Sequence, residues 1–468
     1  MSNTPIPLLI TIFITKKLKN LVDSVRYVCS KTNQTITNEV KTMIRQTILP
    51  FKVEMTRDMI TPHAGLALLG EFAVGLGLLQ SVDRYLPKPG SGAGYSPSEY
   101  IFPLILMLNG GGRSLEDTRQ IRVDEGLREI LPLERIPSSD AFGDWLRSMA
   151  ANGGLYGFEK ANQILLKRGM KYDGIKAYTL DIDATGIVAE KQSAKMTYKG
   201  FKGYMPIVGH IAENGLVLGD EFREGNVAPA TRNLAFIKYC VRQMPKGKSI
   251  KFLRSDSAGY QADIINYCES EGIQFAIGAD LDEAVLEAIR TISNEDWAPY
   301  KNGYIAETVH SMNKTKEAFR LIVIRRPFQS NLFAEKEMSV KYTVIATNRM
   351  ESAEDVVKWY NQRGDCSENR IKELKIGFGM KRMPCGQFEA NAIFFRIGIL
   401  AYNLFRLFIL KTLATSWHRH QVQTIRWRLY QLAGKIVFHG GQVFLKVRRG
   451  LCQLFDDIRL RIWEFATT

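Results

Sequence analysis

The fold of this chain is decided by residues 177–185, which read Ala177-Tyr178-Thr179-Leu180-Asp181-Ile182-Asp183-Ala184-Thr185. Apolar side chains alternate there with polar ones at a period of two residues, which predicts a β-strand. Side chains two residues apart lie on the same face of a strand, so Asp181 and Asp183 share one face. Two acids on one face of an otherwise apolar strand are candidates for chemistry.

The residues that follow predict more strands and two helices. A second and a third strand are joined by an Asn-Gly turn at 213–215, which is a hairpin signal. The predicted order is strands 177–185, 207–212 and 216–222, helix 233–244, strand 249–254, helix 261–271 and strand 273–278. Three hairpin-type strands followed by helix, strand, helix and strand is the order of a ribonuclease-H-like α/β core. We expect residues 171–289 to form the first part of it.

The rest of the chain divides into regions by pattern. Residues 49–170 are predicted to be helical, with a capping box at Ser96 and Glu99. The short helices there fit a helix-turn-helix-like DNA-binding region with 139–149 as its reading helix, and an all-helical packing domain fits equally well. The remaining regions are an uncertain N-terminal extension (1–48), a β-rich insertion (290–350), the second part of the core (351–415) and a basic C-terminal region (416–468).

The charge of the chain predicts a polyanionic partner. The 468 residues include 63 Lys and Arg against 48 Asp and Glu, a net charge of +15. From Lys358 onward there are 19 basic and 7 acidic residues, net +12, so the excess lies mainly in the last quarter. Nucleic acid is the expected partner rather than a membrane. The six scattered cysteines indicate a reducing compartment, and we expect a cytoplasmic protein. The apolar stretch 393–410 is interrupted by Arg396, Asn403 and Arg406 at helical spacing, which predicts a core helix with one polar edge.

Three acids are candidates for a metal site. Asp183 ends the first strand and Asp256 follows the fourth, and in this topology those strands are neighbours. Glu368 is the best-placed third acid. The alternatives are a helper role or a strand-edge charge for Asp181, a helix-capping role for Asp256, and Glu373 in place of Glu368. Carboxylates in this number suit Mg²⁺ or Mn²⁺, and two ions per site can support in-line phosphoryl transfer.

The stretch around Glu368 carries the most specific pattern. Tyr360, Arg363, Glu368 and Lys375 match a signature of Tyr, two residues, Arg, three residues, Glu, six residues, Lys, except that four residues separate Arg363 from Glu368. With Asp183-Ala184-Thr185, Arg254-Ser255-Asp256-Ser257 and Arg223-Glu224-Gly225-Asn226, these residues resemble the bacterial insertion-sequence transposases with an Asp-Asp-Glu active site, in the branch with a β-rich insertion before the Glu. The resemblance covers roughly residues 49–450.

The resemblance implies a role for each matching position. Asp183, Asp256 and Glu368 would bind the metal ions and catalyse metal-dependent cleavage at inverted-repeat ends, followed by transfer of the strand into target DNA. Double-stranded DNA would be the partner, and a homodimer would hold two ends.

Five further positions would contact DNA or stand close to it. Arg363 and Lys375 would bind phosphates, Tyr360 would position the flanking strand, and Arg223 lies in a matching motif. Trp297, the only Trp of the insertion, is either a base-stacking residue or a buried packing residue. The alternatives to an active transposase are an inactive transposase-derived DNA-binding protein and a ribonuclease-H-like nuclease.

Overall fold

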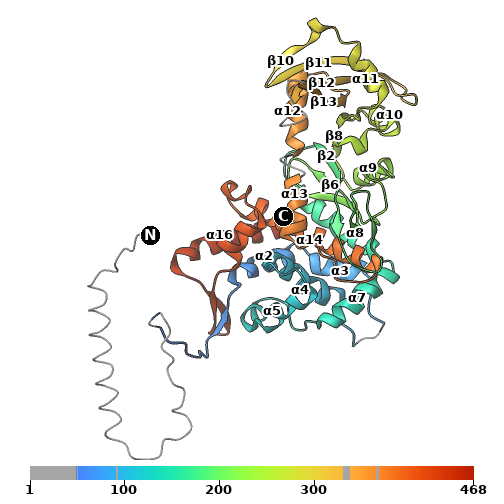
Figure 1. The fold of residues 1–468 in the computed structure, drawn as a ribbon. Coiled ribbons are helices and arrows are strands. Elements are labelled where there is room, and N and C mark those ends of the chain that lie inside the picture. The colour runs from blue at the N-terminus through green and yellow to red at the C-terminus, as the bar shows by residue number, and fades with distance from the viewer. Residues whose placement is uncertain (1–48, 50, 91–92, 330–337, 365–367, 468) are drawn as a thin grey trace, which may run out of the picture. The chain divides into compact units, whose positions relative to one another are not determined.

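The computed structural model describes the chain except residues 1–48, 50, 91–92, 330–337, 365–367 and 468, so the predicted N-terminal extension lies outside the described residues. Residues 58–468 form one compact unit, and residues 1–57 are a separate unit. In that second unit, Leu49 and residues 51–57 are exposed and belong to no helix or strand. The paragraphs below concern residues 58–468 (Figure 1).

The centre of this unit is a mixed sheet of nine strands in the order β10-β11-β12-β13-β9-β8-β2-β6-β7. Five of its strands and two helices follow the predicted order: β2 (Ala177–Ala184), β6 (Ile207–Ile211), β7 (Val217–Glu221), α9 (Asn233–Arg242), β8 (Ser249–Ser255), α10 (Ala262–Glu271) and β9 (Gln274–Gly278). The strand β2 pairs antiparallel with β6 and parallel with β8, so the predicted neighbourhood of the first and fourth strands is confirmed. Gly215 takes the φ of +80° that the Asn-Gly turn between β6 and β7 requires.

The predicted β-rich insertion extends this same sheet. Its elements are α11 (Glu283–Arg290), β10 (Ala298–Tyr300), β11 (Gly303–His310), β12 (Phe319–Gln329) and β13 (Met338–Thr347). The strand β13 pairs antiparallel with β9, which joins the insertion to the core edge to edge. Helix α12 (Ala353–Arg363) lies against these strands, as Figure 1 shows, and buries Val356 and Val357 in a small core with Ile305, Ile322 and Ile345.

The helices before the sheet are α2 (Ala64–Gly75), α3 (Leu78–Tyr85), α4 (Pro97–Gly110), α5 (Thr118–Val123), α6 (Glu125–Ile130), α7 (Ser139–Ala151) and α8 (Gly154–Gly169). The capping box predicted for α4 is present, because the Ser96 backbone N–H donates to Glu99 Oε2 at 2.7 Å. These helices pack on α14 (Phe388–Thr412) and share one hydrophobic core with the sheet. Helix α7 buries Phe142, Trp145 and Leu146, which the packing-domain alternative requires.

Helix α14 carries the polar edge predicted for a core helix. Arg396 pairs with Asp220 at 2.5 Å, Asn403 accepts from the Val217 backbone at 2.8 Å, and Arg406 donates to the Asn214 carbonyl. All three partners lie on β7 or on the turn before it, so the edge fastens the helix to the sheet. The helix is long and apolar enough to cross a membrane, but 89% of its apolar window is buried inside the structure, as in the core helix of a soluble protein.

The C-terminal residues return to the N-terminal helices. A small sheet pairs β1 (Met59–Thr61) with β14 (Gly434–His439), which forms a hairpin with β15 (Gln442–Lys446). Helix α16 (Arg449–Thr467), which was not predicted from the sequence, packs on α2. The rings of Phe72 and Phe465 lie 5.5 Å apart there, and Arg459 binds Glu71 at 2.9 Å. The short remaining elements are β3 (Ile187–Val188), β4 (Lys195–Met196), β5 (Lys202–Tyr204), α13 (Asn369–Lys372) and α15 (Val422–Ile425).

Candidate active site

Two aspartates stand at adjacent ends of parallel strands. Asp183 lies near the end of β2, and Asp256 directly follows β8, where Ile182 pairs in register with Ser255. Parallel strands bring their carboxyl ends to the same edge of a sheet, and ligand sites in open α/β sheets lie there. Asp256 also accepts a hydrogen bond from the Ala258 backbone at 3.3 Å, so the capping role left open for it is present as well.

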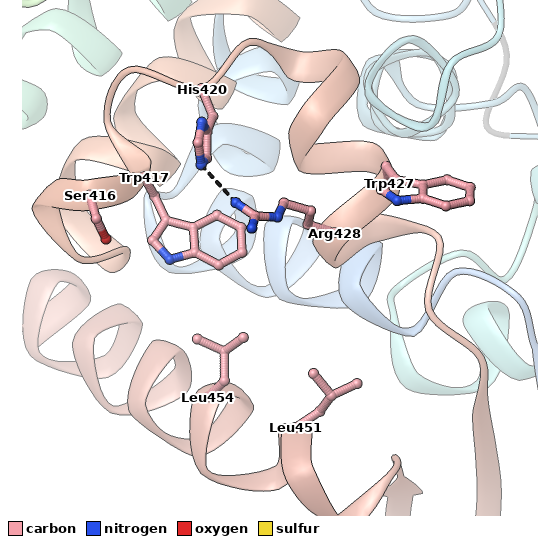
Figure 2. A pocket seen from close by; sticks show the side chains of 7 residues that line it. All are labelled: Ser416, Trp417, His420, Trp427, Arg428, Leu451 and Leu454. Carbon is pink, nitrogen blue, oxygen red and sulfur yellow. Dashed lines mark hydrogen bonds between the residues drawn. The ribbon is translucent and has the colours of Figure 1, made fainter.

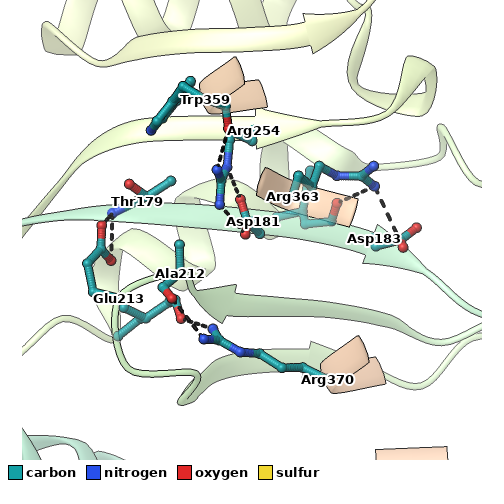
Figure 3. A network of polar contacts seen from close by, with 11 residues as sticks. Thr179, Asp181, Asp183, Ala212, Glu213, Arg254, Trp359, Arg363 and Arg370 are labelled. Carbon is teal, nitrogen blue, oxygen red and sulfur yellow. Dashed lines mark hydrogen bonds and ion pairs between the residues drawn. The ribbon is translucent and has the colours of Figure 1, made fainter. Parts of the chain in front are cut away.

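One arginine side chain lies between these carboxylates. Arg363, the last residue of α12, places Nη2 3.6 Å from Asp183 Oδ2 and 4.0 Å from Asp256 Oδ2. Figure 3 shows this side chain directed at Asp183 from the helix above the sheet. The guanidinium is 10% exposed, and its Nε finds no acceptor among the residues that the structure describes. The Arg363 charge therefore partly compensates the negative charges of Asp183 and Asp256, and its Nε–H is left available as a donor.

Asp183 is an unusual carboxyl group. Burial raises its pKa to about 6, against the opposing effect of the Arg363 charge, and the negative charges of Asp256 and Glu368 raise it further. A carboxyl group with this surplus of negative charge around it gains from an additional cation. Glu368 is thus close enough for its charge to act on Asp183.

The backbone on both sides of residues 365–367 departs from the α-helical pattern. Gly364 and Glu368 both have the π-helical pattern, on either side of residues 365–367. Five residues advance an α-helix by about 140° beyond a full turn, which would place Glu368 far from the face of Arg363. A π-turn takes up one extra residue per turn and is frequent at functional sites. Four residues separate Arg363 from Glu368, one more than in the signature. The π-helical pattern at Gly364 and Glu368 is the geometry that keeps two residues five positions apart on one face.

Asp183 and Asp256 lie close to each other at Arg363, but Glu368 does not join them in one compact group. Among the described residues, no group of three His, Cys, Asp or Glu side chains is close enough to hold a metal ion. The structure therefore unites Asp183 and Asp256 around Arg363, with Glu368 exposed nearby. Glu373 has a different partner: its half-buried carboxylate accepts from the Val422 backbone at 2.7 Å.

Lys375 lies beside the same strand end. Its Nζ donates to the Gly186 carbonyl at 2.7 Å and to Thr185 Oγ1 at 3.1 Å. Burial lowers the pKa of this ammonium, and the neighbouring charge of Lys199 lowers it further. Two cations held this near each other would gain from an anion between them.

Tyr360 stands on the other side, one helical turn before Arg363. Burial raises the pKa of its phenol, and its hydroxyl is hydrogen-bonded to the Gly278 backbone at the end of β9. The close approach requires glycine there, because a Cβ at position 278 would lie 2.9 Å from Tyr360 Oη.

Asp181 has a different role from the helper considered for it. Arg254 donates from Nε to Asp181 Oδ1 at 2.7 Å and from Nη2 to Oδ2 at 2.8 Å, in a pair that is almost fully buried. Its Nη1 donates to the Trp359 carbonyl on α12 at 2.7 Å (Figure 3). Both carboxylate oxygens are thus taken, and the helper role is not supported. Sequence reasoning missed Arg254, although a charged residue inside a buried strand signals a buried partner.

Besides Arg363, two residues expected to contact DNA are buried. Trp297 is 8% exposed, and the Arg325 guanidinium lies 4.2 Å from its ring centre, so it fits the packing alternative and not base stacking. Arg223 is 4% exposed and donates to Glu221 and Asn233 at 3.3 Å. A local ion pair thus holds the Arg223 guanidinium, and the DNA contact expected of it stays a prediction.

The donors at the strand ends fit a hard divalent cation. The Asp183 and Asp256 carboxylates converge on a single positive charge, which Arg363 supplies, and carboxylate oxygens are the donors that Mg²⁺ and Mn²⁺ prefer. Two aspartates are an incomplete set by themselves. Glu368 is the third acid, and its charge acts on Asp183.

Comparison with known proteins identifies a matching family and a similar solved structure. Residues 46–454 match the family described as Transposase DDE domain group 1. The structure resembles a piggyBac transposase in a synaptic complex with hairpin DNA at 9% sequence identity and a TM-score of 0.46, covering 80% of this chain and 82% of that one. No curated protein matches this sequence.

Proposed function

This chain belongs to the Transposase DDE domain group 1 family, and from that premise we propose that it is a bacterial insertion-sequence transposase. The proposed reaction is metal-dependent cleavage of the element's ends followed by strand transfer into target DNA, in a cut-and-paste route. The strand order β7-β6-β2-β8-β9, with β2 and β8 parallel, is that expected of a ribonuclease-H-like core and supports the proposal.

The observation that carries the proposal is the convergence of Asp183 and Asp256 on Arg363. These side chains come from three separate elements and meet at one sheet edge. Asp183, Asp256 and Glu368 would hold Mg²⁺ or Mn²⁺, two ions per site. Such ions supply electrostatic stabilisation of the oxygens that attack and leave the phosphorus.

The proposed chemistry has two balanced steps. In the first, a water oxygen bonds to the scissile phosphorus, the bond from phosphorus to the 3′ oxygen breaks, and a 3′ hydroxyl and a 5′ phosphate are released. In the second, this 3′ hydroxyl attacks a target phosphodiester, and another 3′ oxygen leaves. Each step exchanges one phosphodiester or water oxygen for another, so no oxidant or reductant is required.

The neighbouring cations would bind and orient the DNA backbone. Arg363 has an unused Nε among the described residues, and the charges of Lys199 and Asp183 both act on the Lys375 ammonium. A guanidinium grips a phosphate with two donors, and an ammonium adds a point charge. Tyr360 would position the strand next to the cut. A homodimer, acting in the cytoplasm, would bring the two ends together, with the basic C-terminal region adding affinity.

A cleavage assay on the element's own termini tests the proposal. With Mg²⁺, the wild-type protein is expected to nick a duplex that carries an end and to join the 3′ hydroxyl to a second duplex. Glu368→Gln is expected to bind the end with unchanged affinity and to lose cleavage by at least about a hundredfold. Glu354→Gln, an exposed change near the start of α12, is the matched control and should cleave normally.

The other outcomes identify the alternatives. End binding by the wild-type protein without cleavage under any divalent ion would identify an inactive DNA-binding descendant. Cutting without joining would identify a ribonuclease-H-like nuclease. Equal cleavage by the wild type and Glu368→Gln would contradict the assignment of the third acid.

A further inference from the structure

A cavity of about 590 Å³ opens in the C-terminal region, outside the site described above. It lies between the 3₁₀ turn Thr415–Trp417, the π-turn Arg426–Tyr430 and the first turns of α16. The residues lining it are Ser416, Trp417, His420, Trp427, Arg428, Leu451 and Leu454. None of these residues takes part in the proposed cleavage chemistry.

Two tryptophans line this cavity and are incompletely buried. Trp427 is 80% exposed, on a π-turn whose next residues, Leu429 and Tyr430, are buried in the core. Trp417 is half-buried. An exposed aromatic ring forgoes the favourable free energy that its burial would bring. Such rings mark places where a planar or apolar partner binds.

Arg428 connects two other residues that line the cavity, His420 and Trp417. Arg428 Nη1 donates to His420 Nε2 at 3.0 Å, and its guanidinium lies 5.6 Å from the centre of the Trp417 ring. Figure 2 shows Arg428 reaching across toward His420 above Trp417, with Leu451 and Leu454 rising from α16 on the facing side. A flat ring entering between Trp417 and the leucines would meet apolar surface on both faces and a cation at its edge.

The segment that supplies every residue lining the cavity is basic, and Asp456 and Asp457 follow it on α16. From Ser416 to Phe455 the sequence contains seven Lys and Arg residues and no Asp or Glu. Arg419, Arg448 and Arg449 are exposed in the segments that flank the cavity. This positive charge favours a polyanionic partner over an uncharged apolar peptide, because a neutral partner would gain no electrostatic attraction from it.

We propose that this cavity binds unpaired bases of single-stranded DNA, with Trp417 and Trp427 as stacking surfaces and Arg428 and its basic neighbours as phosphate contacts. Base stacking on aromatic rings combined with cations along the backbone is the physical basis of single-strand binding. Duplex DNA hides its base faces and would use the cations alone. The site goes beyond the proposed cleavage reaction and does not depend on it.

Binding measured without any divalent ion tests this site apart from catalysis. The full chain is titrated into a labelled thymidine oligonucleotide of about 12 nucleotides and into a duplex of the same length, with fluorescence anisotropy as the readout. Trp427→Ala is expected to weaken single-strand binding about tenfold and to leave duplex binding within about twofold. The matched control is Trp463→Ala, an exposed tryptophan of α16 outside the cavity, which should change neither affinity.

A second variant keeps the test decisive. Trp417→Leu retains an apolar side chain and is expected to reduce single-strand affinity by a similar factor, with circular dichroism confirming the fold. Unchanged single-strand binding in both tryptophan variants would overturn the proposal, and so would an equal loss for single strand and duplex. If Trp427→Ala instead converts a DNA-free dimer to a monomer in sedimentation, the cavity is an interface between two copies and the proposal is wrong.

Discussion

Arg254 and Asp181 form a buried two-bond ion pair, at 2.7 and 2.8 Å, that joins β8 to β2. The same guanidinium donates to the Trp359 carbonyl and lies 5.0 Å from the Trp359 ring centre. One side chain thus links the two strands that precede Asp183 and Asp256 to the helix that ends at Arg363. The spacing of the candidate site depends on it.

Breaking this pair is expected to destabilise the fold strongly. Arg254→Met leaves the Asp181 carboxylate buried without a partner, which should lower the free energy of unfolding by about 3–5 kcal/mol. Urea unfolding monitored by circular dichroism measures the change. The double variant Arg254→Met/Asp181→Leu removes both charges and should lose less than the single one. A loss below about 1 kcal/mol in Arg254→Met would show that the pair does not anchor the sheet.

Divalent ions are expected to stabilise the protein through the two aspartates. A ligand that binds only the folded state adds about 2.7 kcal/mol at a hundred times its Kd, so Mn²⁺ should raise the Tm. Asp256→Asn removes one donor and should abolish most of that rise. Asp280→Asn, an exposed aspartate just past the end of β9, is the control and should respond like the wild type. Equal responses of all three proteins would place the ion elsewhere.

His210 is expected to make the protein sensitive to acid. Full burial lowers the pKa of its imidazole to about 3, helped by the charge of Arg370, and neither ring nitrogen has a partner among the described residues. The unfolded chain therefore binds a proton below about pH 6.5, while the folded chain does not. Stability contributed by neutral His210 is complete at pH 8 and falls by about 2 kcal/mol at pH 5.

The His210→Phe variant isolates this effect. The difference in unfolding free energy between wild type and variant should shrink or reverse toward the variant's favour as pH drops from 8 to 5, because only the wild type carries the titrating ring. Unfolding curves in urea at each pH give the comparison. A difference that stays constant with pH would contradict a buried neutral histidine.

Trp297 is expected to contribute to stability and not to DNA contacts. Removing most of a buried indole in Trp297→Ala should cost about 3–5 kcal/mol, while Trp297→Phe retains the ring under Arg325 and should cost less. DNA binding by Trp297→Phe should equal that of the wild type. A Trp297→Phe variant with normal stability and weakened end binding would restore the base-stacking role.

Local patterns in the sequence were sufficient for the sheet. The period of two at 177–185 and the Asn-Gly turn at 213–215 depend on neighbours in the chain, and both appear as predicted. The adjacency of Asp183 and Asp256 followed from the strand order. Long-range pairings were not visible in the sequence: Arg254 meets Asp181 across 73 residues, and Arg223 turns inward to Glu221 and Asn233.

Helical irregularity was the other feature beyond sequence reasoning. The extra residue between Arg363 and Glu368 could be counted, but whether it would rotate Glu368 away or be absorbed depended on packing around α12. The π-helical pattern at Gly364 and Glu368 is a local answer to that problem. Helix α16 was missed because its apolar face makes sense only with α2 beside it, almost 400 positions earlier in the chain.

Because α16 packs on α2, residues 449–467 complete the hydrophobic core around residues 64–75. Truncation before Arg449 would remove Phe455, Ile458 and Ile462 from the core and expose to solvent the side of α2 that carries Phe72. A chain truncated before Arg449 is therefore expected to aggregate instead of persisting as a DNA-binding fragment.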